Sequence, residues 1–191
     1  MLAVIDNGSI YTEQLIRFLS KQNVEYEICD IGKTSINDWT ATLTEKYLTR
    51  FDSFILTGRK ENNRVMNKVN TEIIKHTISQ KKKLLGICYG AEILNLAQSG
   101  TIKRHNERVY GEETVNVEKE NKICKNEISV FESHKWEISQ LGKDLHCLAS
   151  SKSCKCEVIK HNEHDIFGTQ FHPEMTKDGE SLIESFLKII H

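Results

Sequence analysis

Residues 84–92 read LLGICYGAE, an apolar run that ends at Cys88 and leads into a helical pattern. We interpret residues 84–87 as a buried strand and residues 91–98 as part of the next helix. Glycines stand two positions before and two positions after Cys88, an arrangement typical of a nucleophile elbow with cysteine as the nucleophile. Such small neighbours leave room for the sharp turn that pushes the side chain out at the carboxyl end of the strand.

The chemistry of such an elbow depends on the helix that follows it. The amino terminus of that helix favours the thiolate form of Cys88 through its dipole. The backbone amide of Tyr89 then points to the place where an oxyanion would form. The motif alone leaves a second interpretation open, in which Cys88 is a buried structural cysteine in front of a helix.

A cysteine nucleophile needs a base, and one stands near the end of the chain. Residues 166–170 form an apolar run that we interpret as a strand, and the sequence FHPE follows it. Alternate residues of an extended segment point to the same side, so Glu174 can accept from one nitrogen of His172 while the other nitrogen faces Cys88. Pro173 fixes the backbone between them. We therefore predict a triad of Cys88, His172 and Glu174.

The first half of the chain alternates apolar runs with helical patterns. We expect strands at residues 2–6, 26–31, 51–56 and 84–87. We expect helices at residues 12–22, 39–48, 65–79 and 91–98. This alternation predicts an α/β fold with an open, mostly parallel sheet flanked by helices on both faces. Active sites in such sheets lie beyond the carboxyl ends of the strands, which is where Cys88 stands.

The second half is richer in strands, which we expect to pair antiparallel. The expected short strands lie around Val109 and at residues 114–117, 128–131, 145–149, 156–160 and 166–170. A closing helix is expected at residues 178–190, with its apolar residues along one side. Because the sequence has no internal repeat and no linker-like segment, we interpret residues 1–191 as one domain.

The composition disfavours several classes of protein. The 191 residues include 26 Lys and Arg against 27 Asp and Glu, a formal charge of −1, which argues against nucleic acid or a membrane surface as a partner. No stretch approaches the roughly 20 apolar residues that span a bilayer, and the first residues do not resemble a secretory signal. We therefore expect a cytoplasmic protein whose six cysteines are reduced.

The motifs GICYG at residues 86–90 and QFHPE at residues 170–174 resemble those of class I glutamine amidotransferases. The resemblance runs over almost the whole chain and implies the flavodoxin-like sheet of that family. It also implies that Cys88, His172 and Glu174 act on glutamine. In that reaction the cysteine attacks the side-chain carboxamide, ammonia leaves, and water hydrolyses the glutamyl thioester.

Later segments are similar to the glutaminase subunits of archaeal GMP synthases. The similar segments are YGEE at residues 110–113, Ser133-His134, and the run from residue 148 to residue 174. This similarity implies a separate ATP-dependent synthetase as the partner that consumes the ammonia. We expect ATP and Mg²⁺ to belong to that partner and no cofactor to belong to this chain. We also expect the YGEE segment and residues 133–136 to crowd around the mouth of the site.

Two departures from the family pattern lie close to the expected substrate. In the loop after the third strand Gly58 is kept, but Arg59 takes the place of the second glycine. The backbone amide of Arg59 is expected to bind the oxyanion together with that of Tyr89. Glu92 takes the place of a glutamine that, in the family, helps to hold the α-substituents of the substrate.

A third departure is the loop that contains Ser133, Lys135 and Trp136, which we expect to face the substrate. Trp136 is expected either to anchor the partner, since tryptophan is enriched at interface hot spots, or to form a wall of the substrate pocket. Arg59 and Glu92 have opposite charges. We therefore expect them to pair across the site and to occupy the place of the substrate α-carboxylate.

The altered pocket leaves two other functions open. One is a cysteine hydrolase that acts on another amide or on a γ-glutamyl compound, and the other is a low-activity regulatory paralogue. A zinc site can also be considered from the residue types of Cys154, Cys156, His161 and His164. Because only one residue separates the two cysteines, closer than in zinc motifs, we expect no metal centre.

Overall fold

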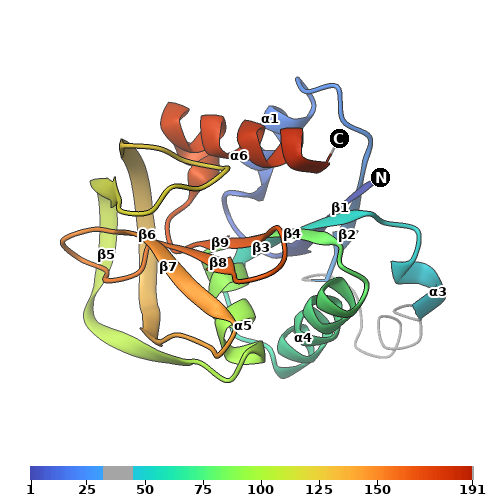
Figure 1. Ribbon diagram of the computed structural model, residues 1–191, viewed down its shortest axis with the longest axis horizontal. Coiled ribbons are helices and arrows are strands. Elements are labelled where there is room, and N and C mark those ends of the chain that lie inside the picture. Colours follow the sequence, from blue (N-terminus) through green and yellow to red (C-terminus); the bar gives the residue numbers. More distant parts are fainter. Residues whose placement is uncertain (32–44, 191) are drawn as a thin grey trace.

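The computed structural model describes residues 1–31 and 45–190 and shows a sheet with helices on both of its faces (Figure 1). The elements in chain order are β1 (Leu2–Asn7), α1 (Thr12–Leu19), β2 (Tyr26–Asp30), α3 (Glu45–Leu48), β3 (Ser53–Arg59), α4 (Arg64–Ser79), β4 (Lys83–Ile87), α5 (Tyr89–Ala97), β5 (Thr101–Val117), β6 (Glu127–Gln140), β7 (Leu145–Ser150), β8 (Val158–His161), β9 (Ile166–Thr169), the 3-10 helix η1 (Pro173–Met175) and α6 (Lys177–Ile190). This order confirms the predicted α/β fold.

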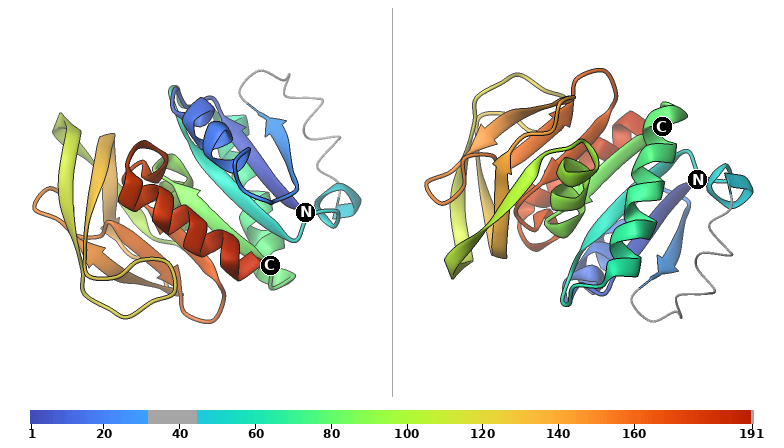
Figure 2. Two further views of the ribbon diagram at one scale, coloured as in Figure 1. Left: turned by 90° about the horizontal axis from the view of Figure 1, so that it is seen from above. Right: turned by 90° about the horizontal axis from the view of Figure 1, so that it is seen from below.

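The described residues form a nine-stranded sheet in the order β2-β1-β3-β4-β9-β8-β7-β5-β6. The pairs from β2 through β1, β3 and β4 to β9 are parallel, and the remaining pairs are antiparallel. In Figure 2 the β5–β6 hairpin lies at the end of the molecule that is far from β1 and β2. Because β9 lies beside β4 and runs parallel to it, the carboxyl ends of these two strands meet at one edge of the sheet.

Apolar side chains on the two faces of the sheet form two separate cores. Alternate residues of β1 divide between them, since Leu2 and Val4 face one core while Ala3 and Ile5 face the other. Helices α1 and α6 cover the first face, and α4 and α5 cover the second (Figure 1). Because both faces are covered, the central strands are continuous apolar runs, and this is the property that identifies them in the sequence.

Several element ends differ from the predicted ones. α5 begins at Tyr89 rather than at Ala91, so the helix starts directly after Cys88. The helix predicted at residues 39–48 is described only at its end, as α3, and residues 39–44 lie outside the described residues. The short η1 helix was not predicted, because a single turn has no apolar period to detect.

The region from β5 to β6 corrects the sequence prediction most. Instead of short strands around Val109 and at residues 114–117 and 128–131, two long strands form an antiparallel hairpin. Most side chains of β5 are exposed or half-buried, so its sequence shows no clear alternation of apolar and polar residues. Backbone pairing with β6 at residues 101–104 and 109–116 defines this strand instead.

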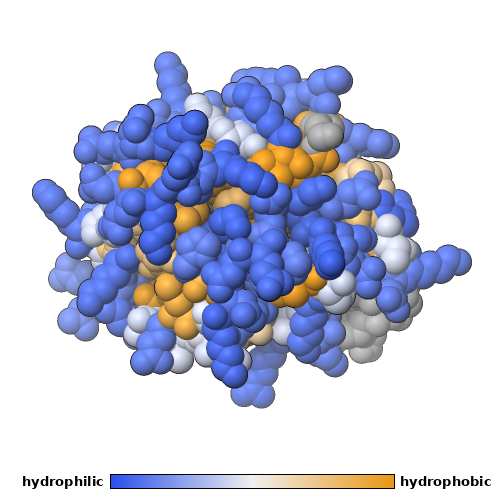
Figure 3. Space-filling model, viewed as in Figure 1, coloured by the Kyte–Doolittle hydropathy of each residue, from blue (hydrophilic) through white to orange (hydrophobic). Residues whose placement is uncertain are grey.

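The surface seen in Figure 3 is mostly hydrophilic, with apolar residues showing between the charged ones. Among the described residues, no helix combines the length and the apolar character that crossing a membrane requires. All six cysteines lie in the described part of the chain, and none of them is joined to another in a disulfide.

Candidate active site

Cys88 occupies a strained turn between β4 and α5. Its φ of 50° and ψ of −102° lie in a region that residues other than glycine rarely adopt. The turn needs small neighbours, because a Cβ on Gly86 would lie 2.5 Å from the carbonyl carbon and oxygen of Gly90. A Cβ on Gly90 would lie 2.4 Å from the carbonyl oxygen of Leu56. The two glycines therefore allow the close packing that their spacing around Cys88 predicts.

His172 and Glu174 lie beside this turn because β9 pairs with β4. Ile87 is level with Thr169, and the Cys88 N–H donates to the Thr169 carbonyl oxygen at 2.7 Å. His172 Nδ1 and Glu174 Oε1 are 2.9 Å apart, and both side chains are buried. With Nδ1 donating to the carboxylate, the other ring nitrogen of His172 is left for the hydrogen bond with the Cys88 thiol.

Burial and neighbouring charges act in opposite directions on this pair. Burial by itself lowers the pKa of His172, but Glu174 and Cys88 outweigh it, so this pKa lies well above its usual value. Burial raises the pKa of the Cys88 thiol, the positive charge of His172 lowers it, and the negative charges of Glu92 and Glu132 raise it further. The thiolate therefore depends on the imidazolium beside it.

These side chains open on a cavity of about 470 Å³. The sequence-predicted site residues that line it are Cys88, Tyr89, Arg59, Glu92, Ser133, Lys135, Trp136 and His172. Gly58 and Glu174 do not line the cavity themselves. Each lies next to His172, which does. A Cβ on Gly58 would lie 2.8 Å from His172 Cε1, so the glycine makes room for the imidazole ring.

Arg59 and Glu92 form the ion pair that we expected from their opposite charges. Arg59 Nη2 and Glu92 Oε2 are 3.8 Å apart, with 15% and 5% of the two side chains exposed. The Arg59 guanidinium also lies 4.1 Å from the centroid of the Tyr89 ring and donates to Asn62 and Asn67. Burial raises the pKa of Glu92, and the charge of Arg59 lowers it. These contacts hold both charged groups on the cavity wall.

Sequence reasoning missed several residues of the cavity, and two of them, Tyr11 and Arg108, contact predicted site residues. The ring of Tyr11 meets that of His172 edge-on at a centroid distance of 4.5 Å, and its hydroxyl lies 2.9 Å from Ser133 Oγ. Arg108 donates to the same Ser133 Oγ at 2.5 Å. Tyr11 stands just before α1, and Arg108 stands in β5, two residues before the YGEE segment. Only the tertiary fold brings them to the cavity, so no local signal could have found them.

The mouth of the cavity differs in part from the prediction. Four consecutive residues of the β6 strand, from Ser133 to Trp136, line the cavity, and Trp136 is 39% exposed. The predicted YGEE segment does not line it, and its Glu112 and Glu113 border a separate surface cavity. The reason is the length of the hairpin, which carries β5 past the site.

The structure separates one set of candidate metal ligands and brings another set together. Four residues were considered as zinc ligands, namely Cys154, Cys156, His161 and His164. Within the described part of the chain, the fold does not bring these four together as a group of ligands. His161 and His164 instead stack on each other, with ring centroids 4.8 Å apart. The fold does gather a different set of acidic side chains, namely Glu113, Glu132 and Glu157.

Known proteins resemble the chain over almost its full length. The family model described as glutamine amidotransferase class-I matches residues 3–190. The glutamine-hydrolyzing GMP synthase subunit of Methanocaldococcus jannaschii is 29% identical over 194 residues, which cover 99% of this chain and 97% of the relative. The protein of the same description from Pyrococcus furiosus is 30% identical over 195 residues, which cover 99% of this chain and 98% of the relative.

A solved structure supports the same relationship. The crystal structure of a candidate GMP synthase subunit from Thermoplasma acidophilum matches with a TM-score of 0.80 and 27% sequence identity. The match covers 99% of this chain and 92% of the other one. The fold is thus shared along almost the whole chain.

Proposed function

The chain belongs to the class-I glutamine amidotransferase family, and we propose that it is the glutamine-hydrolysing subunit of a two-subunit GMP synthase. The observation that carries this proposal is the strained Cys88 turn beside the hydrogen-bonded pair of His172 and Glu174. Full-length similarity to the glutamine-hydrolyzing GMP synthase subunits of the two archaea supports the choice of partner. That partner is a separate synthetase that uses ATP and Mg²⁺ and consumes the ammonia.

The proposed reaction begins at Cys88. Its thiolate attacks the carboxamide carbon of glutamine, and the backbone N–H groups of Tyr89 and Arg59 stabilise the oxyanion. The C–N bond then breaks as His172 donates a proton to the leaving ammonia. Next, His172 accepts a proton from water, which attacks the thioester and releases glutamate and the Cys88 thiol. Glu174 keeps the imidazole oriented and stabilises its positive charge through both halves.

The ion pair of Arg59 and Glu92 affects how glutamine can bind in the cavity. Both side chains line the cavity in which glutamine must bind, and their charges are satisfied by each other. A substrate α-carboxylate that approaches Glu92 meets a like charge unless the pair rearranges. We infer that the isolated chain hydrolyses glutamine slowly and that docking of the synthetase changes the arrangement of the pair.

A glutamine-analogue electrophile tests the proposal. We expect 6-diazo-5-oxo-L-norleucine to label Cys88, glutamine to protect it, and Cys88→Ala to abolish labelling, each measured by mass spectrometry of the intact chain. Cys124→Ala is a matched control, since Cys124 is also a buried free thiol but lies outside the cavity. Iodoacetamide reports the general reactivity of the thiol, independently of glutamine recognition.

The same experiment separates the alternatives. Reaction of Cys88 with iodoacetamide but not with the glutamine analogue, even in the Arg59→Gly, Glu92→Gln double variant, would favour a hydrolase for another amide. Failure of both reagents would favour a regulatory chain without an active thiol. Either result contradicts the proposed function.

Trp136 is the proposed contact with the synthetase. It is exposed at the rim of the cavity, where the ammonia must leave, and tryptophan is frequent at interface hot spots. We expect Trp136→Ala to weaken association by roughly tenfold or more in titration calorimetry with the synthetase. Leu141→Ala is the control, because Leu141 is equally exposed but does not border this cavity. An effect confined to the KM for glutamine would instead make Trp136 a substrate wall.

A further inference from the structure

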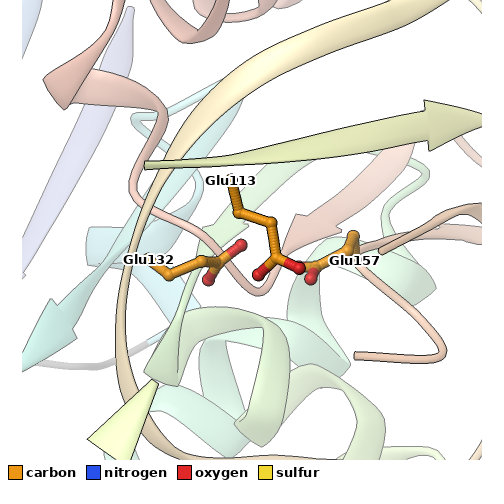
Figure 4. Close-up of side chains that lie close together, drawn as sticks. All are labelled: Glu113, Glu132 and Glu157. Carbon is orange, nitrogen blue, oxygen red and sulfur yellow. The ribbon is translucent and has the colours of Figure 1, made fainter. Parts of the chain in front are cut away.

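Three carboxylates from different parts of the second half converge inside the protein. Figure 4 shows Glu113, Glu132 and Glu157 with their carboxyl groups turned toward one another. One carboxylate oxygen from each lies within 4.8 Å of those from the other two. Glu132 and Glu157 are 1% and 0% exposed, and Glu113 is half-buried.

The strand register explains how they meet. Glu113 is level with Val130 in the β5–β6 pair, and Glu132 stands two residues beyond Val130, so both glutamates share one face of the hairpin. Glu157 stands just before β8, where its backbone N–H donates to the Ala149 carbonyl oxygen. The arrangement therefore ties the hairpin to the segment between β7 and β8.

The carboxylates are only partly satisfied by protein donors. Ser153 donates to Glu113 through its backbone N–H and its hydroxyl, and the Ser151 hydroxyl donates to Glu157 Oε1 at 2.6 Å. Both oxygens of Glu132 and the Oε2 of Glu157 accept no hydrogen bond from a backbone N–H, a hydroxyl or a cationic side chain, and the carboxyl groups of Glu132 and Glu157 lie close enough to share a proton. Among the described residues, no lysine or arginine forms an ion pair with any of the three.

A buried histidine lies beside one member of this group, Glu132. His134 is 1% exposed in its side chain, and its Nδ1 lies 2.8 Å from the carbonyl oxygen of Trp136. A carbonyl oxygen only accepts, so Nδ1 carries the proton and leaves the lone pair on Nε2. No group donates a hydrogen bond to that Nε2 atom, which lies 3.1 Å from Glu132 Oε2. A histidine with this second contact is oriented as metal-ligating histidines are.

We propose that Glu113, Glu132 and Glu157 bind a divalent cation of the Mn²⁺ class, with the Nε2 of His134 beside them. Three negative charges in so small a buried space need a positive charge or protons to balance them. A cation would occupy the oxygens that no donor reaches. Carboxylate oxygens suit Mg²⁺, Ca²⁺ and Mn²⁺, and the neighbouring imidazole nitrogen favours Mn²⁺ among these.

The site has an entrance and a structural role. Glu113 borders a surface cavity of about 600 Å³, which gives an ion a route to the buried pair. His134 also lines the candidate active site, next to Ser133 and Lys135. The ion would therefore fix the β6 strand that forms one wall of the active site. It takes no part in the proposed hydrolysis of glutamine, so the two proposals stand or fall separately.

Equilibrium binding of Mn²⁺ to chelator-treated protein tests the site. Free Mn²⁺ gives an electron paramagnetic resonance signal that is lost on binding, so the titration yields stoichiometry and affinity. We expect one Mn²⁺ per chain and an upward shift of Tm as the ion is added. Glu132→Gln is expected to weaken binding at least tenfold. Glu112→Gln is the matched control, because Glu112 stands in the same strand and borders the same surface cavity without belonging to the group.

The metal-free variants guard against a folding artefact. Glu132→Gln removes a like charge, so its Tm without metal is expected to be no lower than that of the unchanged chain. Glu113→Gln, at the least buried position of the three, provides a second test should Glu132→Gln misfold. Absence of saturable binding, or equal affinity in the Glu132→Gln, Glu113→Gln and Glu112→Gln variants, would overturn the proposal in favour of carboxyl groups balanced by protons.

Discussion

Cys88 and His172, which carry the proposed chemistry, are held by the backbone of the sheet. Arg59, which lines the cavity for the substrate, is held by contacts between side chains. Cys88 and His172 follow β4 and β9, neighbouring strands inside the sheet, and backbone hydrogen bonds and close packing fix their positions. Arg59 stands at the end of β3 and is held by an ion pair, a ring and two side-chain amides. The first arrangement is built into the core, whereas the second depends on side chains alone.

This difference separates the mechanism from the choice of substrate. A substitution of Gly86 or Gly90 disturbs the packing of β3, β4 and α5, so the backbone that positions Cys88 can change little without loss of stability. A substitution of Arg59 or Glu92 alters charge in a cavity without reshaping the sheet. The departures from the family pattern that we noted all lie among such cavity side chains, and the triad residues show none.

The largest expected effect comes from the nucleophile. Cys88→Ala should lower glutamine hydrolysis by about four orders of magnitude, because the thioester can no longer form. The urea midpoint should stay unchanged, since alanine fits the turn. His172→Ala should be nearly as severe, and the double variant no worse than either single one. Normal turnover by Cys88→Ala, measured as glutamate release, would reject the site.

Two glycine substitutions compare the tightly packed turn at Cys88 with the more open β5–β6 hairpin. Gly86→Ala should lower the free energy of unfolding by about 3 kcal/mol, because the new Cβ meets the backbone of Gly90. Gly111→Ala in the hairpin meets no atom within 4 Å, but its φ of +118° is unfavourable for alanine. There we expect a loss of only about 1 kcal/mol. Equal losses in urea titrations would mean that the turn tolerates more than its packing suggests.

The cavity pair is expected to act on activity rather than on stability. The double variant Arg59→Gly, Glu92→Gln should raise glutamine hydrolysis by the isolated chain about tenfold, more than the product of the two single changes. The reason is that the two side chains constrain each other. Strong hydrolysis by the unchanged chain without any partner would refute the inhibitory role of the pair.

The smallest effect is a shift in a pH profile. The negative charge of Glu92 raises the pKa of the Cys88 thiol, so Glu92→Gln should lower that pKa. The rate of alkylation by iodoacetamide follows the thiolate fraction, and its rise with pH should therefore begin at a lower pH in the variant. A profile that does not move, or that moves to higher pH, would show that Glu92 is uncharged or does not act on the thiol. Glu112→Gln again provides the control.

The elbow and the parallel strands could be predicted from the sequence because each depends on neighbours in the chain. Gly86 and Gly90 fix the turn around Cys88 locally, and the runs at residues 2–6 and 84–87 are apolar because both sheet faces are covered. The ion pair of Arg59 and Glu92 followed from the expected place of both residues at the cavity.

The rest depends on contacts that no local pattern encodes. Tyr11 reaches His172 only because α1 packs against η1, the short helix that follows β9. The length of β5 comes from pairing with β6 rather than from its own side chains. The group around Glu132 requires the register of the hairpin and the position of Glu157 together, so the sequence shows only scattered glutamates.

The position of β9 also has a consequence for the order of events during synthesis. This strand is the last of the sheet to emerge, yet it inserts between β4 and β8 rather than adding to an edge. Until it arrives, β4 presents an open apolar edge, and Cys88 has no histidine beside it. Long-range pairing of this kind makes folding slow and leaves the edge exposed to wrong partners. The proposed hydrolysis of glutamine therefore cannot begin before β9 has paired with β4.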